Sequence, residues 1–264
     1  MTGLGLRRCR RTALLAILVW LRSTAGAVAS ESSTEFWPEV DLWFRLTPSW
    51  RVSTLAALTR NLETDYREGT LVLQADYAWG KPGLVYKGRL LDESRAQSMK
   101  AMMARAGYLG ATSLGDGGDA YREKTIFLEW HLRVPLANQV LLSHRLRTDL
   151  RWLGDPSELS ERWRYRIMVE KEINAGRCSW VPYGSAEAFY DSRYDTINRL
   201  RSIAGTSVAW TPRVALEGNF TYQHDSKSSV TNVYALNVIL HVYFEKGRAH
   251  RSKTDSGRRP ATGG

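Results

Sequence analysis

The fold is predicted above all from one stretch of eleven residues, Tyr234-Ala-Leu-Asn-Val-Ile-Leu-His-Val-Tyr-Phe244. Every second side chain from Tyr234 to Phe244 is aromatic or aliphatic, whereas Asn237, His241 and Tyr243 fall between them. Successive side chains of a β-strand point to opposite faces, so the segment predicts a strand with one apolar face and one polar face. An alternating segment of about ten residues that ends on an aromatic is typical of a transmembrane β-barrel.

The same alternation recurs along the chain, and its polar face is often ionic. In one example, Trp163, Tyr165, Ile167 and Val169 alternate with Arg164, Arg166, Met168 and Glu170. Similar patterns occupy 126–134, 140–152 and 214–223. A soluble sandwich would have to cover all the apolar faces with a second sheet, whereas lipid covers them in a barrel. We therefore predict an all-β protein, an antiparallel up-and-down transmembrane β-barrel.

The strand count follows from the turns between the alternating segments. The candidate strands are 37–46, 50–61, 69–79, 84–92, 125–135, 139–152, 162–173, 180–190, 199–210, 213–224 and 233–244. Single-chain bacterial barrels normally have an even number of strands. The stretch 93–124 is ambiguous, because 104–114 could supply one more strand and 94–105 could instead form a short helix. We predict twelve strands, with ten as the alternative.

Tryptophans accompany the candidate strand ends, where barrels place interfacial aromatic girdles. The residues assigned to these girdles are Trp37, Trp43, Trp50, Trp79, Trp130, Trp152, Trp163, Trp180 and Trp210.

The two ends of the chain differ in composition from the segment between them. Arg7, Arg8, Arg10 and Arg11 precede a ten-residue apolar stretch and small residues near Ala29, which predicts a cleaved signal peptide over 1–29. That stretch is too short for a transmembrane helix, which needs about 20 apolar residues. Residues 30–244 form the predicted barrel, and 245–264 a basic, disordered tail.

The basic net charge does not indicate a nucleic-acid partner. The formal charge is +10, of which +5 lies in 1–29 and +4 in 245–264, so 30–244 carry only +1. The arginines of the barrel segment are interspersed with Glu and Asp rather than forming a basic patch.

Six segments, in this order, give the chain a family resemblance. They are Glu35-Phe-Trp-Pro-Glu-Val-Asp-Leu-Trp43; His144-Arg-Leu-Arg-Thr-Asp-Leu-Arg151 with Glu161-Arg-Trp-Arg-Tyr-Arg-Ile167; Pro182-Tyr-Gly-Ser-Ala-Glu-Ala-Phe-Tyr-Asp191; Asn198-Arg-Leu-Arg201; and the closing Val242-Tyr-Phe244. With them the chain resembles the bacterial outer-membrane barrel family catalogued as "domain of unknown function 2490". The stretch 93–124 is longer than that pattern. The resemblance implies a barrel in the outer membrane of a Gram-negative bacterium, and it implies no catalytic residues.

The polar strand faces predict a charged lumen, and buried charges must be paired or hydrated. The residues predicted to line it are Arg145, Arg147, Asp149, Arg151, Arg162, Arg164, Arg166, Glu170, Glu187, Arg199, Arg201 and Glu217. Three functions remain open: a structural barrel closed by Arg/Glu pairs, a narrow pore for small polar or anionic solutes, and an outer-membrane lipid-modifying enzyme.

The enzyme is the weakest of the three, because no serine is marked by its neighbours as a nucleophile beside a histidine. We expect no enzyme, catalytic residue, cofactor or metal site. The expected partners are outer-membrane lipids, lipopolysaccharide and, through the C-terminal strand, the barrel assembly machinery, without nucleic acid.

Overall fold

The computed structural model describes residues 32–82, 100–115, 122–154, 158–175, 178–211 and 213–245. In this part of the chain nearly every residue lies in a β-strand, and the one helical element is the 3-10 turn η1 (Ala137–Gln139). None of the described segments is a helix with the length and apolar character needed to cross a bilayer.

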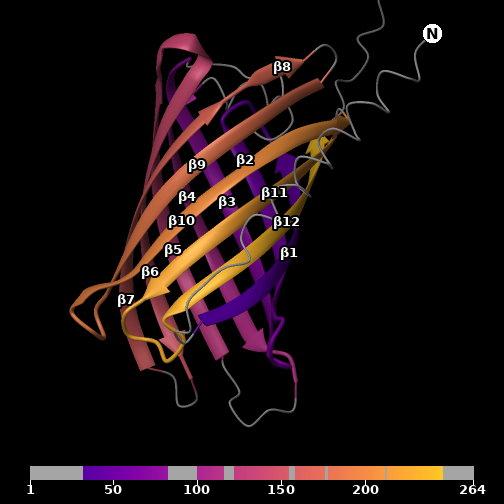
Figure 1. Cartoon of the computed structure of the whole chain (residues 1–264). Coiled ribbons are helices and arrows are strands. Elements are labelled where there is room, and N and C mark those ends of the chain that lie inside the picture. The colour runs from indigo at the N-terminus through magenta and orange to yellow at the C-terminus, as the bar shows by residue number, and fades with distance from the viewer. Residues whose placement is uncertain are drawn as a thin grey trace, which may run out of the picture.

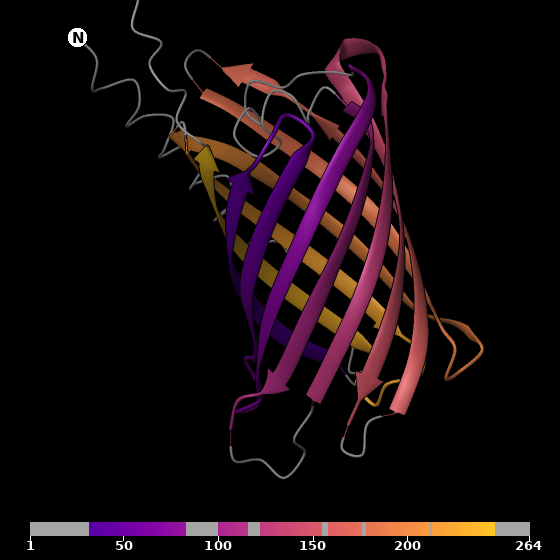
Figure 2. The same cartoon turned by 180° about the vertical axis from the view of Figure 1, so that it is seen from behind.

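The structure has twelve strand segments. They form a barrel of tilted strands, seen from opposite sides in Figures 1 and 2. All except β8 are 12 to 16 residues long. The strands are β1 (Ser32–Arg45), β2 (Trp50–Asn61), β3 (Arg67–Pro82), β4 (Lys100–Ser113), β5 (Arg122–Pro135), β6 (Val140–Leu153), β7 (Glu158–Lys171), β8 (Ile173–Ala175), β9 (Cys178–Asp191), β10 (Thr196–Thr211), β11 (Val214–Asp225) and β12 (Asn232–Glu245).

The ring closes through a parallel pair. Neighbouring strands follow the order β1-β2-β3-β4-β5-β6-β7-β9-β10-β11-β12, and β12 returns to β1. Every contact in this ring is antiparallel except β1 with β12, where Ser32 lies opposite Asn232 and Arg45 opposite Glu245. Strand direction alternates along the chain, so a ring with an odd number of strands must pair its first and last strands in parallel.

β8 is a continuation of β7 rather than a separate strand of the ring. Glu170 of β7 pairs with Tyr183 of β9, and Ile173 of β8 pairs with Trp180 in the same register. The ladder is interrupted only around Glu172, which lies between β7 and β8. Twelve strand segments therefore make a ring of eleven strands.

The predicted all-β barrel is confirmed, and the predicted total of twelve strands matches the segments of the structure. The ring itself differs from the expected even, fully antiparallel one, because β7 and β8 count as one strand and the closing pair is parallel. The ambiguous region contains strand β4, which excludes a helix over its residues 100–105. The candidate strand 84–92, the signal peptide 1–29 and the tail after Glu245 lie outside the described residues.

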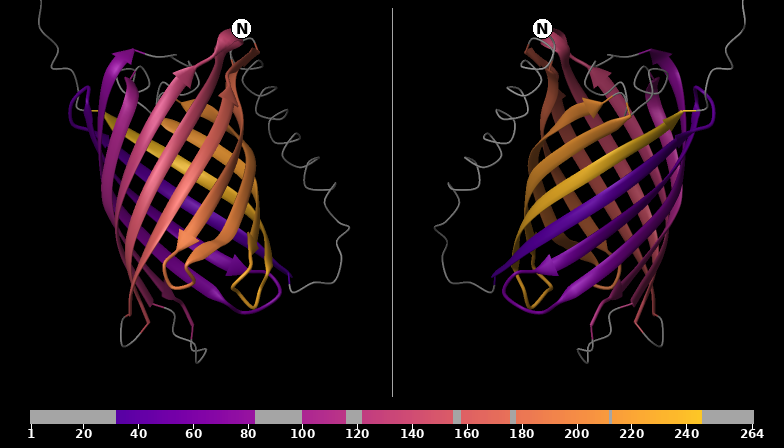
Figure 3. Two further views of the ribbon diagram at one scale, coloured as in Figure 1. Left: turned by 90° about the vertical axis from the view of Figure 1, so that its left-hand side faces the viewer. Right: turned by 90° about the vertical axis from the view of Figure 1, so that its right-hand side faces the viewer.

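The parallel closure places the two ends of the barrel chain at opposite rims. We call the rim where β1 begins the N-rim and the rim where β12 ends the C-rim. The short turns after Arg45 and Pro135 lie at the C-rim, and the connections after Asn61, Asp191 and Asp225 lie at the N-rim. Figure 3 shows the two rims from the sides.

Side chains alternate between the two surfaces of the wall. On β5, Ile126 and Leu128 are 49% and 55% exposed, whereas Phe127 and Glu129 are each 1% exposed. The exposed members of the alternation are apolar and the buried members are mostly polar or charged. This distribution is the reverse of a soluble protein, whose buried face is normally apolar.

Gly107, on the inner face of β4, makes room for the aromatic side chain of Phe127. A Cβ on Gly107 would lie 2.4 Å from Cζ of Phe127 and 2.7 Å from the carbonyl oxygen of Leu73. The absence of a side chain at Gly107 therefore lets the Phe127 ring lie against β4.

Candidate functional site

The inner faces of β2 to β9 carry one connected set of ion pairs, which we call the interior network. Its carboxylates are Asp76, Glu123, Glu129, Asp149, Glu187 and Asp191. Its arginines are Arg51, Arg105, Arg145, Arg147, Arg151, Arg162, Arg164 and Arg193. Every member except Arg193, which lies in the turn after β9, is placed by the alternation of its strand.

Glu129 on β5 is a central member of the interior network. Its carboxylate accepts hydrogen bonds from Arg147 Nη1 at 3.0 Å and Arg105 Nη1 at 3.3 Å. Nε2 of His131 lies 2.9 Å away, and Nη1 of Arg145 lies 3.6 Å away. Basic groups from β4, β5 and β6 thus converge on one buried carboxylate.

Asp149 on β6 joins two strands in a similar way. Oδ1 accepts from Nε of Arg147 at 2.5 Å, and Oδ2 accepts from Nε of Arg162 at 2.8 Å. Towards the N-rim, Arg151 bridges Glu123 and Asp191, each at 3.1 Å. These bonds tie β5, β6, β7 and β9 together across the inside of the barrel.

The N-rim end of the interior network extends into a connection between strands. Arg193, in the turn after β9, donates from Nη2 to Oδ2 of Asp191 at 2.8 Å. This side-chain hydrogen bond raises the pKa of Arg193.

Glu187 on β9 accepts from arginines of two other strands. Its Oε1 accepts from Nη2 of Arg145 at 2.6 Å and from Nε of Arg164 at 2.9 Å. Arg145 lies on β6 and reaches over β7 to make this contact. The strand register places Arg166 and Arg201 directly beside Glu187, on β7 and β10.

Aromatic rings support several of these guanidinium groups. Cζ of Arg147 lies 3.9 Å from the ring centre of Phe127, and Cζ of Arg164 lies 4.6 Å from that of Phe189. Cζ of Arg51 lies 3.9 Å from the ring of Trp43. Stacking on an aromatic face restrains a guanidinium and partly compensates for its removal from water.

The wall formed by β11, β12 and β1 carries acids and one histidine. Nδ1 of His241 lies 3.0 Å from Oδ2 of Asp41, and its Nε2 lies 3.5 Å from Oε2 of Glu217. The hydroxyl of Tyr183 donates to Glu217. Carboxylates thus lie on this wall, whereas β6, β7 and β10 carry the arginines predicted to line the lumen.

All twelve residues predicted to line the lumen lie on the inner face of a strand. Seven of them are in the interior network: Arg145, Arg147, Asp149, Arg151, Arg162, Arg164 and Glu187. Outside that set, Arg199 pairs with Asp225 at 2.6 Å, and Arg201 donates to Gln223. Glu217 belongs to the acidic wall, Glu170 is buried, and Arg166 lies beside Arg145 and Glu187.

Several interior residues were missed or misassigned from the sequence. Arg51, Asp76 and Arg105 join the network through β2, β3 and β4, and Arg105 falls in the ambiguous stretch 93–124. Trp37 and Trp43 were assigned to the girdles but lie inside: Nε1 of Trp37 donates to Glu35, and Trp43 is 7% exposed. Their odd numbering, in step with Asp41, was the signal that could have placed them inside.

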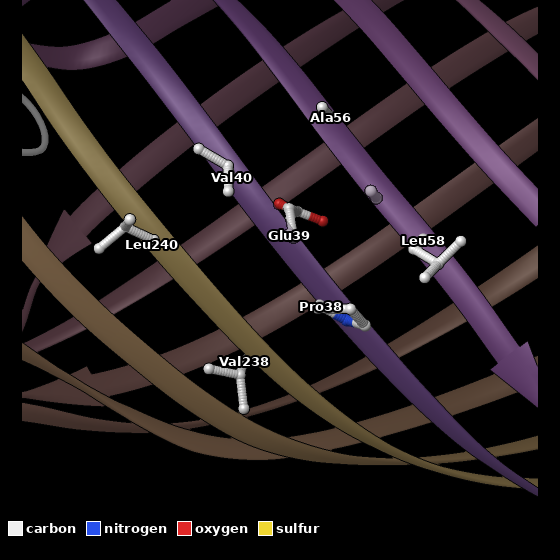
Figure 4. Close-up of a pocket in the computed structure, with 8 residues that line it drawn as sticks. Pro38, Glu39, Val40, Ala56, Leu58, Val238 and Leu240 are labelled. Atoms are coloured by element: carbon white, nitrogen blue, oxygen red, sulfur yellow. The ribbon is translucent and has the colours of Figure 1, made fainter. Parts of the chain in front are cut away.

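A recess in the outer wall has a different chemistry. A pocket of about 410 Å³ lies over β12, β1 and β2 and is lined mainly by Pro38, Val40, Ala56, Leu58, Val238 and Leu240 (Figure 4). Proline has no N–H to donate, and Pro38 lies in a gap in the β1–β2 pairing between Phe36 and Glu39. Small and apolar side chains therefore leave a shallow apolar recess here.

Each histidine in the described part of the chain has a polar neighbour. His131 and His241 lie beside carboxylates, whereas Nδ1 of His144 is 2.8 Å from the Tyr165 hydroxyl and Nδ1 of His224 is 3.1 Å from Oδ1 of Asn232. Within the described residues, no group of three or more His, Cys, Asp or Glu side chains is arranged to hold a metal ion.

Comparison with known proteins assigns this chain to a family. The family described as "Protein of unknown function (DUF2490)" matches residues 34–234, from β1 into β12. No curated protein and no solved structure gave a match. The family predicted from the six quoted segments is thereby confirmed: this chain belongs to the DUF2490 family.

Proposed function

We propose that this protein is an outer-membrane β-barrel of a Gram-negative bacterium whose interior is closed to bulk solutes by the interior network. Its outer face supports the membrane part of the proposal. From Tyr234 to Phe244, every outward residue of β12 is apolar or aromatic. At about 3.4 Å per residue and a tilt near 40°, this run covers about 25 Å of barrel height, which equals the apolar band of membrane barrels.

Aromatic side chains gather on the outer face near both rims. Towards the C-rim, the rings of Phe44 and Phe244 stack with their centres 4.7 Å apart, and Trp50 lies 4.8 Å from Tyr77. Towards the N-rim, Tyr222 and Tyr234 lie 5.3 Å apart. Paired girdles of this kind suit the two interfaces of a bilayer.

Lipid is the partner that the outer face fits best. The recess around Pro38 and Ala56 is apolar and open to the outside, so an acyl chain of a phospholipid or lipopolysaccharide would fill it. We further propose that β12, which ends on Phe244 and Glu245, is the segment that the barrel assembly machinery receives.

One observation supports the proposal that the interior is closed: Asp149, Glu129 and Glu187 face the inside of the barrel and are 0%, 1% and 3% exposed. The lining of a water-filled pore stays in contact with solvent, as in large porins. These three carboxylates are instead paired with arginines, two of which, Arg147 and Arg164, stack on the rings of Phe127 and Phe189. The geometry therefore favours a structural barrel over an open pore.

Fractionation tests the membrane part of this proposal. We expect the protein in the outer membrane, with heat-modifiable migration in detergent gels, because a closed barrel has no free edges and resists unfolding. A soluble monomer recovered from the periplasm without detergent would overturn it.

Replacing Arg145, Arg147 and Arg164 with Gln tests the network. The change removes both arginines that hydrogen-bond Glu187 and leaves Asp149 with Arg162 alone. We expect the triple variant to unfold at clearly lower urea concentration than the unmodified protein. The Arg193→Gln variant is the control, because Arg193 is part of the same network but lies at the rim, and equal melting of both variants would contradict a structural network.

A further inference from the structure

We propose that the barrel interior contains a binding site for one small oxyanion, a phosphate or a carboxylate, held by Arg166 and Arg201 on either side of Glu187. The inference goes beyond the proposed function, since it requires the arrangement of interior charges and not a membrane.

Strand register brings the two arginines together. Arg166 of β7 and Arg201 of β10 are both paired with Glu187 of β9, one on each side, and all three side chains point inward. Neighbouring strands lie about 4.8 Å apart, so the two Cα atoms are separated by about 10 Å. An arginine side chain is long enough for both guanidinium groups to meet over the middle strand.

Glu187 is already occupied by other partners. Its Oε1 accepts hydrogen bonds from Arg145 and Arg164, at 2.6 and 2.9 Å. Arg145 also lies directly opposite Arg166 in the β6–β7 pair. Four guanidinium groups therefore lie around Glu187. Arg145 is shared with Glu129, at 3.6 Å, and the positive charges still outnumber the carboxylates here.

Arg166 and Arg201 carry this excess. In the described part of the chain, no carboxylate oxygen lies within 4.0 Å of either guanidinium. Arg166 has no hydrogen bond there, and Arg201 donates only to the neutral Oε1 of Gln223, from Nε at 3.0 Å and from Nη2 at 2.5 Å. Arg199, two residues before Arg201, differs because its Nε and Nη2 both donate to Oδ2 of Asp225.

The excess of positive charge suits an oxyanion because of the chemistry of arginine. A guanidinium stays charged in a protein, and Arg166 and Arg201 are half-buried, so water hydrates their charge only in part. Its planar fork matches carboxylate and phosphate oxygens in two-point contacts. The rings of Phe189 and Trp37, 5.1 and 5.6 Å from Cζ of Arg201, flank this guanidinium and limit its movement. An oxyanion between the two arginines supplies the missing negative charge.

Calorimetry on the folded full-length mature chain tests the site. The protein is held in zwitterionic detergent without phospholipid or lipopolysaccharide, so any binding is to the free anion, and is titrated with inorganic phosphate or with acetate. We expect saturable binding of one phosphate per chain. Arg166→Gln and Arg201→Gln should each weaken it about 10- to 100-fold, since each removes charge-assisted hydrogen bonds. Arg199→Gln should change it less than about twofold, because Arg199 is paired with Asp225.

Thermal melting supplies a second, independent readout. Without phosphate, Arg166→Gln should melt at the same or a higher temperature than the unmodified protein, because it removes a charge that lacks a carboxylate. Phosphate should raise the melting temperature of the unmodified protein and leave that of Arg166→Gln unchanged. Acetate binding in place of phosphate would identify a carboxylate site. The absence of saturable binding by either anion, equal weakening in Arg199→Gln, or unfolding of Arg166→Gln would each overturn the site, without bearing on whether the barrel is closed or lies in a membrane.

Discussion

Glu129→Gln is the substitution that tests the interior network most severely. Gln keeps the size of Glu129 but removes its charge, which at present faces Arg105, Arg145, Arg147 and His131 within 3.6 Å. Glu129 is 1% exposed, so solvent screens these contacts little. Removing one partner of a buried ion pair costs about 3 to 5 kcal/mol, and several arginines lose a partner here. We therefore expect a loss of about 3 to 5 kcal/mol in the free energy of unfolding.

The assay is reversible urea unfolding of the refolded barrel in detergent, followed by tryptophan fluorescence and by heat-modifiable migration. Arg193→Gln is the matched control: the Arg193 side chain is 35% exposed in its pair with Asp191, and such rim pairs contribute about 0 to 1 kcal/mol. A double variant, Glu129→Gln with Arg147→Gln, should lose less than the sum of the two single losses, because the carboxylate and the guanidinium interact. A loss below about 1 kcal/mol for Glu129→Gln, or additive losses in the double variant, would refute the network as a source of stability.

Two further predictions test the faces of the wall. Gly107→Ala should destabilise the barrel by about 1 to 3 kcal/mol in the same urea assay, because the new Cβ would overlap Phe127 and the backbone. Gly110→Ala is the control. Its Cβ would meet only Tyr108, at 3.7 Å or more, so this variant should be neutral or slightly stabilising. Leu240→Arg and Ile167→Arg should impair insertion into vesicles by about 2 to 4 kcal/mol, and Asn237→Arg on the inner face should be much milder; equal tolerance at all three sites would reverse the face assignment.

Much of this architecture follows from period-two alternation alone. The pattern in 162–173 and 233–244 identified the apolar and charged faces, because a residue's face depends only on its position along its own strand. The closure of the ring depends instead on which strands meet. Nothing in the local pattern of Ser32–Arg45 says that β1 pairs in parallel with β12, and nothing in Ile173–Ala175 says that β8 extends β7.

The ion-pair partners within the interior network could not be predicted from local sequence either. The inward arginines of β6 and β7 were identified from the sequence, but their partners depend on register across several strands. Arg145 bonds to Glu187 over an intervening strand, and Arg51 meets Asp76 from the neighbouring one. Trp43 was placed at an interface because tryptophan favours interfaces, yet its ring lies beneath Arg51 inside the barrel. Composition predicts a charged interior, and only the register assigns its partners.

Conductance across a planar lipid bilayer tests the closed barrel most directly. We expect the unmodified protein to insert without steady ion-conducting steps, because the inward carboxylates Glu129, Asp149 and Glu187 are buried among paired arginines. The Arg145, Arg147 and Arg164 triple-Gln variant should leak if it remains inserted, since it lacks three of the groups that cover those carboxylates. Stable, porin-sized steps from the unmodified protein would contradict the closed interior and show that solutes pass the network.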